Sequence, residues 1–305
     1  MVACETFSRI GIIILIFQCA QLFPSDQPGM TRDSTALKDE LRTMYFKAAE
    51  EEKHPLELIQ IIEDILKLEP RSAIFWYYRG EQFQLMQDYE NAIRSYEPCL
   101  ELYRVSGTKP MIQVFDNLGY CYLMQEENLK ALKVYDSAMV YYPIHPLIKG
   151  RKAVSSYAAG RTRAAGRLLG EYRDYWLHVG KNESDILYNM GLLFLDLDNG
   201  RAERYFREAL ETDPGDIDKQ ASLARVMITS GIKVDEAIVI LETAMESEPD
   251  NPEILHLCGW GYLRLEDYSR AREYLLRADS LYEGYHHNLE LQLEQTERVL
   301  RHKLF

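Results

Sequence analysis

Few residues in this 305-residue sequence have the types and spacing that catalysis requires. There is no GxSxG nucleophile motif, no phosphate-binding P-loop, no HExxH zinc motif and no GxGxxG dinucleotide motif. His286 and His287 are adjacent, so on a helix they point in different directions and do not predict a metal site. Asp196 and Asp198 flank a turn beside Asn199-Gly200, but a calcium loop needs further oxygen ligands that are missing here. We expect a protein that is not an enzyme and that binds no metal and no cofactor.

The charge of the chain argues against a nucleic-acid partner. There are 48 acidic and 35 basic residues, which gives a formal net charge of -13. A surface of this sign repels phosphate backbones. We therefore expect the partners to be other proteins.

The first twenty residues have the form of a secretory signal peptide. An apolar run over residues 10–17 follows Arg9 and precedes the small residue Ala20. The run is shorter than the roughly 20 apolar residues of a membrane-spanning helix, and we predict cleavage after Ala20. Two alternatives stay open, a retained signal anchor and lipidation of Cys19. All three predict export to the periplasm or cell envelope of a bacterium, with the membrane reached only through this segment.

Residues 21–38 follow as a predicted polar linker, because the stretch PSDQPGMTRDS shows no helical pattern. Beyond it, small residues recur at a period near 34 residues. The first series consists of Gly80, Gly119, Ala153, Gly191, Ala224 and Gly259. A second series keeps step with it and consists of Ala92, Ala131, Ala165, Ala202, Ala237 and Ala271. Two series that advance together predict a repeated pair of helices, with a small residue where the two helices cross closely.

The residues around these positions resemble the W-x2-L-G-x2-Y, A-x3-F, P pattern of the tetratricopeptide repeat. In one unit the pattern is formed by Phe115, Leu118, Gly119, Tyr122 and Ala131. The resemblance covers residues 39–285 and implies an all-α, right-handed superhelical solenoid of about seven helix-turn-helix units. We place the units at residues 39–72, 73–106, 112–145, 146–179, 184–216, 217–251 and 252–285. The first and fourth units are degraded, and for the first this is expected because an N-terminal unit caps the stack.

Residues 286–305 predict a final helix that covers the last hydrophobic edge of the stack. One face of it would carry Leu289, Leu293, Thr296, Leu300 and Leu304. Three cysteines fall inside the array at scattered positions, Cys99, Cys121 and Cys258, with no zinc-ligand spacing. We expect three buried thiols, with a Cys99–Cys121 disulfide as the alternative because these residues belong to neighbouring hairpins.

Solenoids of this kind bind partners on an extended concave surface. The inward positions of the first helices carry aromatic residues with polar tips, namely Tyr77, Tyr120, Tyr157, Tyr188, His256 and Trp260. Such residues suit a groove for an extended peptide segment. The alternative is that they pack on the next hairpin, and the sequence does not decide between the two.

A basic island lies within residues 146–179 of this acidic chain. Its members are Lys149, Arg151, Lys152, Arg161, Arg163, Arg167 and Arg173, against Glu171 and Asp174. Arg151 falls on the first helix of its unit, so we predict that it helps to hold an acidic segment of a partner. The alternative is an ordinary scatter of charge on solvated faces. The carboxylate-gripping chaperone site of the family would need five polar residues, of which only Asn117 and Arg151 match, so we do not expect cytosolic chaperone recruitment.

We therefore expect a non-catalytic protein-binding scaffold or assembly factor that acts through the concave face. The alternative is a membrane-anchored regulatory or sensor subunit of an envelope complex. Fold alone does not name the partner.

Overall fold

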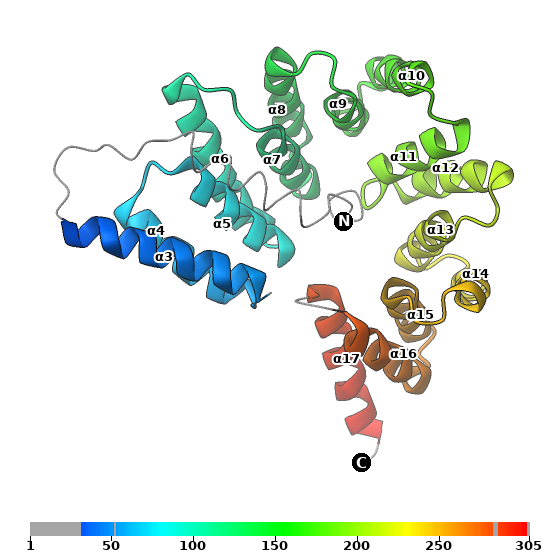
Figure 1. Cartoon of the computed structure of the whole chain (residues 1–305). Helices are drawn as coiled ribbons and strands as arrows, with labels where there is room; N and C mark the ends of the chain where they lie inside the picture. The colour runs from blue at the N-terminus through cyan, green and yellow to red at the C-terminus, as the bar shows by residue number, and fades with distance from the viewer. Residues whose placement is uncertain (1–31, 52, 283–285, 304–305) are drawn as a thin grey trace.

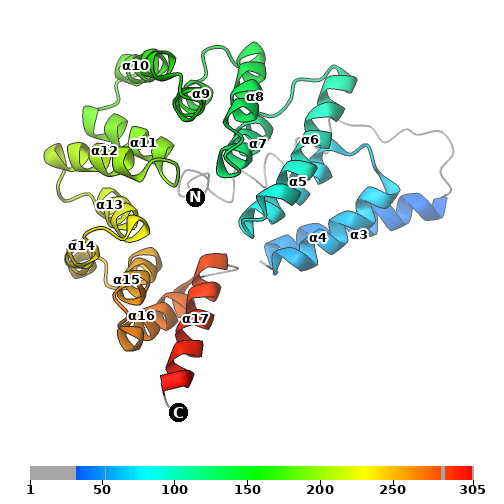
Figure 2. The ribbon, with the colours of Figure 1, turned by 180° about the vertical axis from the view of Figure 1, so that it is seen from behind.

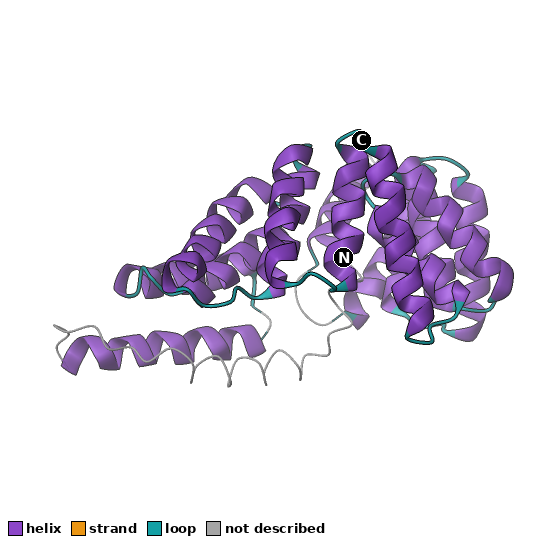
Figure 3. Cartoon of the chain, turned by 90° about the horizontal axis from the view of Figure 1, so that it is seen from above, coloured by secondary structure: helices purple, strands orange, loops and turns teal. Residues whose placement is uncertain are grey.

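A computed structural model describes residues 32–51, 53–282 and 286–303, and this part of the chain forms fifteen helices and no strand (Figures 1 and 3). The helices are α3 (Arg32–Glu50), α4 (Pro55–Leu68), α5 (Ala73–Leu85), α6 (Tyr89–Ser106), α7 (Ile112–Met124), α8 (Asn128–Tyr141), α9 (Pro146–Ala158), α10 (Thr162–His178), α11 (Glu183–Phe194), α12 (Asn199–Thr212), α13 (Ile217–Ser230), α14 (Val234–Ser247), α15 (Pro252–Arg264), α16 (Tyr268–Leu281) and α17 (His287–Lys303). Successive helices pair into seven hairpins, from α3–α4 to α15–α16, and α17 packs on the last one.

The hairpins follow one another along a curve (Figures 1 and 2). From α5 to α16, the first helix of each hairpin lies on the inside of the curve and the second helix lies on the outside (Figure 1). The predicted fold class, an all-α helical-repeat solenoid, is confirmed. The inner row of first helices α5, α7, α9, α11, α13 and α15 is called the concave face below.

The small residues of the repeat lie where the two helices of a hairpin cross. A Cβ atom on Gly80 would come within 2.5 Å of the Tyr96 ring, and one on Gly191 would come within 2.5 Å of the Phe206 ring. Glycine therefore lets the large ring of the second helix pack directly against the backbone of the first. The alanines of the second helices, such as Ala92, are fully buried on the other side of the same crossing.

Hairpin turns are short where one residue adopts the left-handed conformation that ends the first helix. Gln87, Glu126 and Glu266 have φ of 56°, 58° and 59° at equivalent places in three hairpins. In the first and last of these three hairpins an aspartate then caps the second helix, as Asp88 does by accepting a hydrogen bond from the amide of Asn91 at 3.1 Å.

The predicted linker ends earlier than expected, because α3 begins at Arg32 and residues 32–38 are helical. Contacts to the end of α4 and to α5 hold α3 in place. Lys38 Nζ lies 3.3 Å from a carboxylate oxygen of Glu69, and Arg42 lies 2.7 Å from the other oxygen. The Tyr45 ring stacks on Tyr78 with centroids 5.3 Å apart. The helix thus begins before residue 39, and the partners that hold it come from a later part of the chain.

The predicted signal segment, residues 1–20, and linker residues 21–31 lie outside the described residues, as does Leu304. No helix that the structure describes has the length and hydropathy needed to span a bilayer. Near the C-terminus, Leu289 of α17 is 1% exposed and packs with Leu255, Leu275 and Ala278. This helix therefore covers the apolar edge of the last hairpin.

The three cysteines of the array are buried free thiols. Cys99 lies on α6 and Cys121 on α7, and they form no disulfide with each other. Burial raises the pKa of Cys121 to about 12, so this thiol stays protonated and unreactive at neutral pH.

Candidate functional site

The middle of the concave face carries an aromatic cluster around Tyr120. This residue lies on α7 and is half-buried. The ring of Tyr89, at the start of α6, meets it edge-to-face with centroids 6.1 Å apart. The guanidinium of Arg151, on α9, lies 5.6 Å from the centre of its ring. Burial first, and then the negative charge of Asp196, raise the pKa of Tyr120 well above its ordinary value, so the phenol remains neutral.

Arg151 already has an anionic partner inside the protein. Its Nε atom donates to Oδ1 of Asp116 at 2.7 Å, and both side chains are only 12% exposed. Asp116 belongs to α7, so the ion pair joins two neighbouring hairpins. The hydroxyl of Tyr135 donates to the backbone oxygen of Asp116 at 3.1 Å. Arg151 therefore positions the Tyr120 ring, and little of its charge reaches a ligand.

Tyr157, on α9, forms a second aromatic and arginine pair. Its ring meets Phe194 edge-to-face at 5.8 Å, and the guanidinium of Arg201 lies 4.0 Å above it. The Arg201 side chain is 34% exposed and also lies 3.3 Å from Asp198. This arginine was missed by the sequence analysis, because it stands in the first turn of a second helix, away from the inward positions of the repeat.

Tyr188 contacts the next helix of the inner row, and His256 contacts the final helix α17. The hydroxyl of Tyr188 lies 3.3 Å from the hydroxyl of Ser222 on α13. Nε2 of His256 lies 3.0 Å from Oε1 of Gln292 on α17. Burial is the main cause that lowers the pKa of His256 to about 4, so the imidazole is neutral at pH 7. For these two residues the structure places the polar tip against a neighbouring hairpin or helix.

The remaining two predicted residues differ in exposure. Tyr77 is 8% exposed, and its hydroxyl donates to Glu81 at 2.6 Å. Burial raises the pKa of Glu81 to about 7. Trp260, on α15, is half-buried and packs against the main core. The structure thus brings Tyr120 and Arg151 together and leaves the other predicted residues spread along the solenoid.

The basic island is largely paired. Lys149, Lys152 and Arg173 lie 3.1, 2.8 and 2.8 Å from Glu171, Asp136 and Glu183. Arg161, Arg163 and Arg167 are exposed and form no ion pair within the described residues. Arg161 stands at the N-cap position of α10 and the other two lie within that helix, so these free charges belong to the outer helix of the hairpin.

The residues that matched the chaperone-binding pattern are also occupied. The amide of Asn117 donates to the hydroxyl of Tyr96 at 3.1 Å, and the residue is 6% exposed. With Arg151 paired to Asp116, neither is available to hold a carboxylate.

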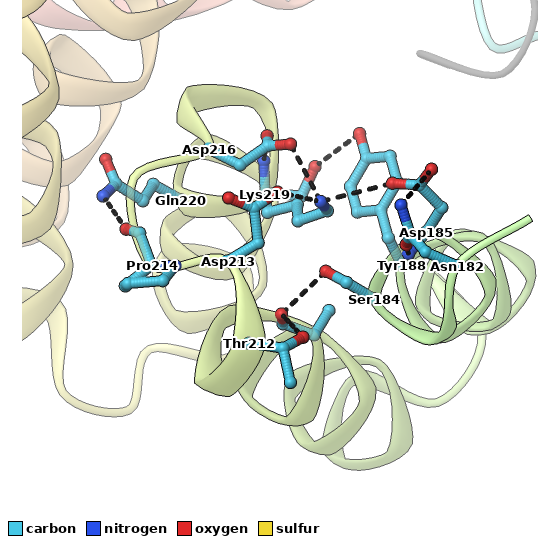
Figure 4. Close-up of polar contacts among 12 residues, drawn as sticks. Asn182, Ser184, Asp185, Tyr188, Thr212, Asp213, Pro214, Asp216, Lys219 and Gln220 are labelled. Atoms are coloured by element: carbon cyan, nitrogen blue, oxygen red, sulfur yellow. Dashed lines mark hydrogen bonds and ion pairs between the residues drawn. The ribbon is translucent and has the colours of Figure 1, made fainter.

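A buried lysine joins two hairpins next to Tyr188 (Figure 4). Lys219, on α13, is 2% exposed, and its Nζ atom lies 2.7 Å from Asp213, 2.9 Å from Asp216 and 3.3 Å from Asp185. Asp185 stands one helical turn before Tyr188 on α11, so the lysine fixes the position of that helix. The sequence analysis missed this cluster, and its signal was the spacing Asp213, Asp216, Lys219.

No family model and no curated protein matches the chain. Solved structures of similar arrangement include a tetratricopeptide repeat protein from Parabacteroides merdae, which is 17% identical with a TM-score of 0.48, over 85% of this chain and 98% of that one. A repeat protein from Cytophaga hutchinsonii is 13% identical with a TM-score of 0.42, over 80% and 95% of the two chains. YrrB, described as having an unusual peptide-binding site, is 17% identical with a TM-score of 0.34, over 77% and 97%.

At these identities and TM-scores the comparisons carry no argument about function. The repeat pattern agrees with the hairpins that the described residues form, in which small residues such as Gly80 and Gly191 pack at the helix crossings. The chain forms an all-α solenoid of helical hairpins, and its repeat pattern resembles that of tetratricopeptide-repeat proteins.

Proposed function

We propose that this protein is a non-catalytic scaffold or assembly factor that holds an extended segment of another protein on its concave face. The observation that carries the proposal is a pair of half-buried tyrosines, Tyr120 on α7 and Tyr157 on the neighbouring inner helix α9. Each ring has an arginine against it, Arg151 beside Tyr120 and Arg201 beside Tyr157. Rigid aromatic faces beside a fixed cation are typical of the residues that dominate protein interfaces.

The charge of the bound segment follows from which arginine it can reach. Arg201 is 34% exposed, whereas Arg151 is 12% exposed and paired with Asp116. An acidic side chain of the partner would therefore meet Arg201 first. This supports a segment with at least one carboxylate placed next to the Tyr157 ring.

Substitutions on the concave face test the proposal. The native partner would first be captured with the wild-type protein and identified by mass spectrometry, and its affinity would then be measured by calorimetry. Tyr120→Ala and Tyr157→Ala should each cost more than about 2 kcal/mol of binding free energy, which is typical of interface hot spots. Lys133→Ala, on the exposed face of α8, is the control and should change little. Equal affinities for all three variants would remove the centre of the concave face as the binding site.

Arg201→Gln tests the charge separately. Because Arg201 is partly exposed, its contact with a carboxylate is screened by salt. The variant should bind more weakly and show a smaller loss of affinity between low and high ionic strength. Arg151→Ala is unsuitable for this purpose, since it would leave the buried Asp116 without its partner.

We further propose that the protein is exported and works in a bacterial envelope, on the strength of the apolar run over residues 10–17 behind Arg9. The same run supports the second candidate, a membrane-anchored regulatory or sensor subunit, if the segment is retained. Sequencing of the native N-terminus separates the two.

A further inference from the structure

Two segments that are 201 residues apart in the sequence meet in the structure. Nε2 of Gln87 donates a hydrogen bond to Oδ1 of Asn288 at 2.7 Å. Gln87 is in the turn between α5 and α6, and Asn288 is the second residue of α17. The end of α5 and the start of α17 lie next to each other in Figures 1 and 2, so the curved row of hairpins closes on itself at this point.

Both sides of the contact are held in place by their own surroundings. Gln87 is in the left-handed region, and its backbone amide donates to Gln84 at 2.9 Å. The next amide, of Asp88, donates to Phe83 at 2.9 Å. On the other side, Leu289 is 1% exposed and anchors the first turn of α17 to the last hairpin. The hydrogen bond therefore joins two rigid parts of the solenoid.

The other hairpins provide an internal comparison. Glu126 and Glu266 occupy the same left-handed turn position in the third and seventh hairpins, and both are exposed. Gln87 is half-buried and carries an uncharged amide where these two carry a carboxylate. The Gln87 turn thus differs from its equivalents in burial, in charge and in having a partner from the far end of the chain.

We propose that the Gln87–Asn288 hydrogen bond is a latch that closes the solenoid around its concave face, and that the solenoid opens at this contact. In a solenoid each repeat contacts its neighbours, so small changes of angle between hairpins add up at the two ends. A single neutral hydrogen bond shifts such an equilibrium about fivefold, which corresponds to about 1 kcal/mol. The latch therefore opens and closes readily. If the concave face binds a partner, as proposed above, the latch sets how large a partner can enter.

Pulsed electron paramagnetic resonance between two spin labels would measure the opening. The labels would be placed at Glu90→Cys and Glu294→Cys, which are exposed positions near the two sides of the latch. The full-length chain would be used with Cys4 and Cys19 replaced by serine, since the three cysteines of the array are buried. The wild-type latch should give a main population at short distance.

Variants of the latch should change the balance in a defined way. Gln87→Met keeps the length of the side chain and removes the donor, so the ratio of open to closed forms should rise about fivefold. Asn288→Asp keeps an acceptor for Gln87 and should leave the distance distribution unchanged. Glu126→Met makes a similar change in the equivalent turn of the next hairpin and should also have no effect.

Two results would overturn the latch. One is a distribution of label-to-label distances in Gln87→Met that equals the wild-type distribution. The other is a wild-type distribution whose main population already lies at the long distance. Circular dichroism of each variant would establish that the helices are intact. The measurement needs no partner, so its failure would leave the proposed binding function standing, and a failure to bind would leave the latch standing.

Discussion

Replacing Lys219 by methionine tests whether the buried cluster between two hairpins stabilises the solenoid. The lysine is 2% exposed and has three carboxylates within 3.3 Å of its Nζ atom, from Asp185, Asp213 and Asp216. Methionine keeps most of the apolar stem and removes the charge. The variant therefore leaves three carboxylates facing one another without a cation.

The expected loss of stability follows from the exposure of the partners. Removing one member of a fully buried ion pair costs about 3–5 kcal/mol. Here the side chains of Asp216, Asp185 and Asp213 are 30%, 35% and 50% exposed, so water screens the remaining charges. Hydrogen bonds to charged groups contribute about 1.5–3 kcal/mol, and we expect a loss near 2 kcal/mol at pH 7.

The effect should depend on pH in a direction set by Asp216. Burial alone would raise the pKa of this carboxyl, but hydrogen bonds from Lys219 outweigh burial and lower it from its ordinary value of 3.8. The folded pKa is thus below the unfolded one. The contribution to stability is present above about pH 4 and is lost as the pH falls through the folded pKa. The difference between wild type and Lys219→Met should therefore shrink at pH 3.

Urea unfolding followed by circular dichroism at pH 7 and pH 3 would measure these differences. Lys47→Met is the matched control, because its side chain is 74% exposed and its ion pair with Glu51 spans 3.7 Å. That variant should lose less than about 0.5 kcal/mol. Hydrogen exchange should show the added loss in α13 and in the hairpin before it. The reasoning is refuted if Lys219→Met costs no more than Lys47→Met at pH 7.

Three further predictions concern other parts of the chain. Gly119→Leu should lower the free energy of unfolding by about 1–3 kcal/mol, because its Cβ would fall on the buried Tyr135 ring. Gly166→Leu is the control and should leave the stability unchanged, because the space around Gly166 is open. Equal melting of the two variants would contradict the helix crossing. The free energy of unfolding of wild type should fall relative to that of His256→Gln between pH 6.5 and pH 4, by about 1.4 kcal/mol per pH unit. The reason is that the pKa of His256 is lowered in the folded protein, so the unfolded state binds the proton first. Parallel curves of stability against pH for the two proteins would rule this out. Sequencing of the native protein should find Gln21 at the N-terminus, and a chain that keeps Met1 and stays in the membrane would favour the anchored alternative.

The repeat could be predicted from the sequence because its signal is local and occurs many times. Gly80 and Ala92 must be small for one pair of helices to cross, and the same requirement recurs near every 34 residues. The apolar face of the final helix was also visible, since Leu289 and Leu293 follow helical spacing and pack as that spacing predicts. Fold class therefore depends on patterns that are contained within each hairpin or helix.

The partners of the candidate site residues were decided only by the tertiary structure. Repeat position indicates which helix face carries Tyr188 or Arg151, but the distance to the next hairpin depends on how each hairpin is rotated against its neighbour. That rotation brings Ser222 to Tyr188 and Asp116 to Arg151. Local periodicity therefore determined that the chain forms a solenoid, and the accumulated geometry of packed hairpins decided that the second hairpin meets the final helix.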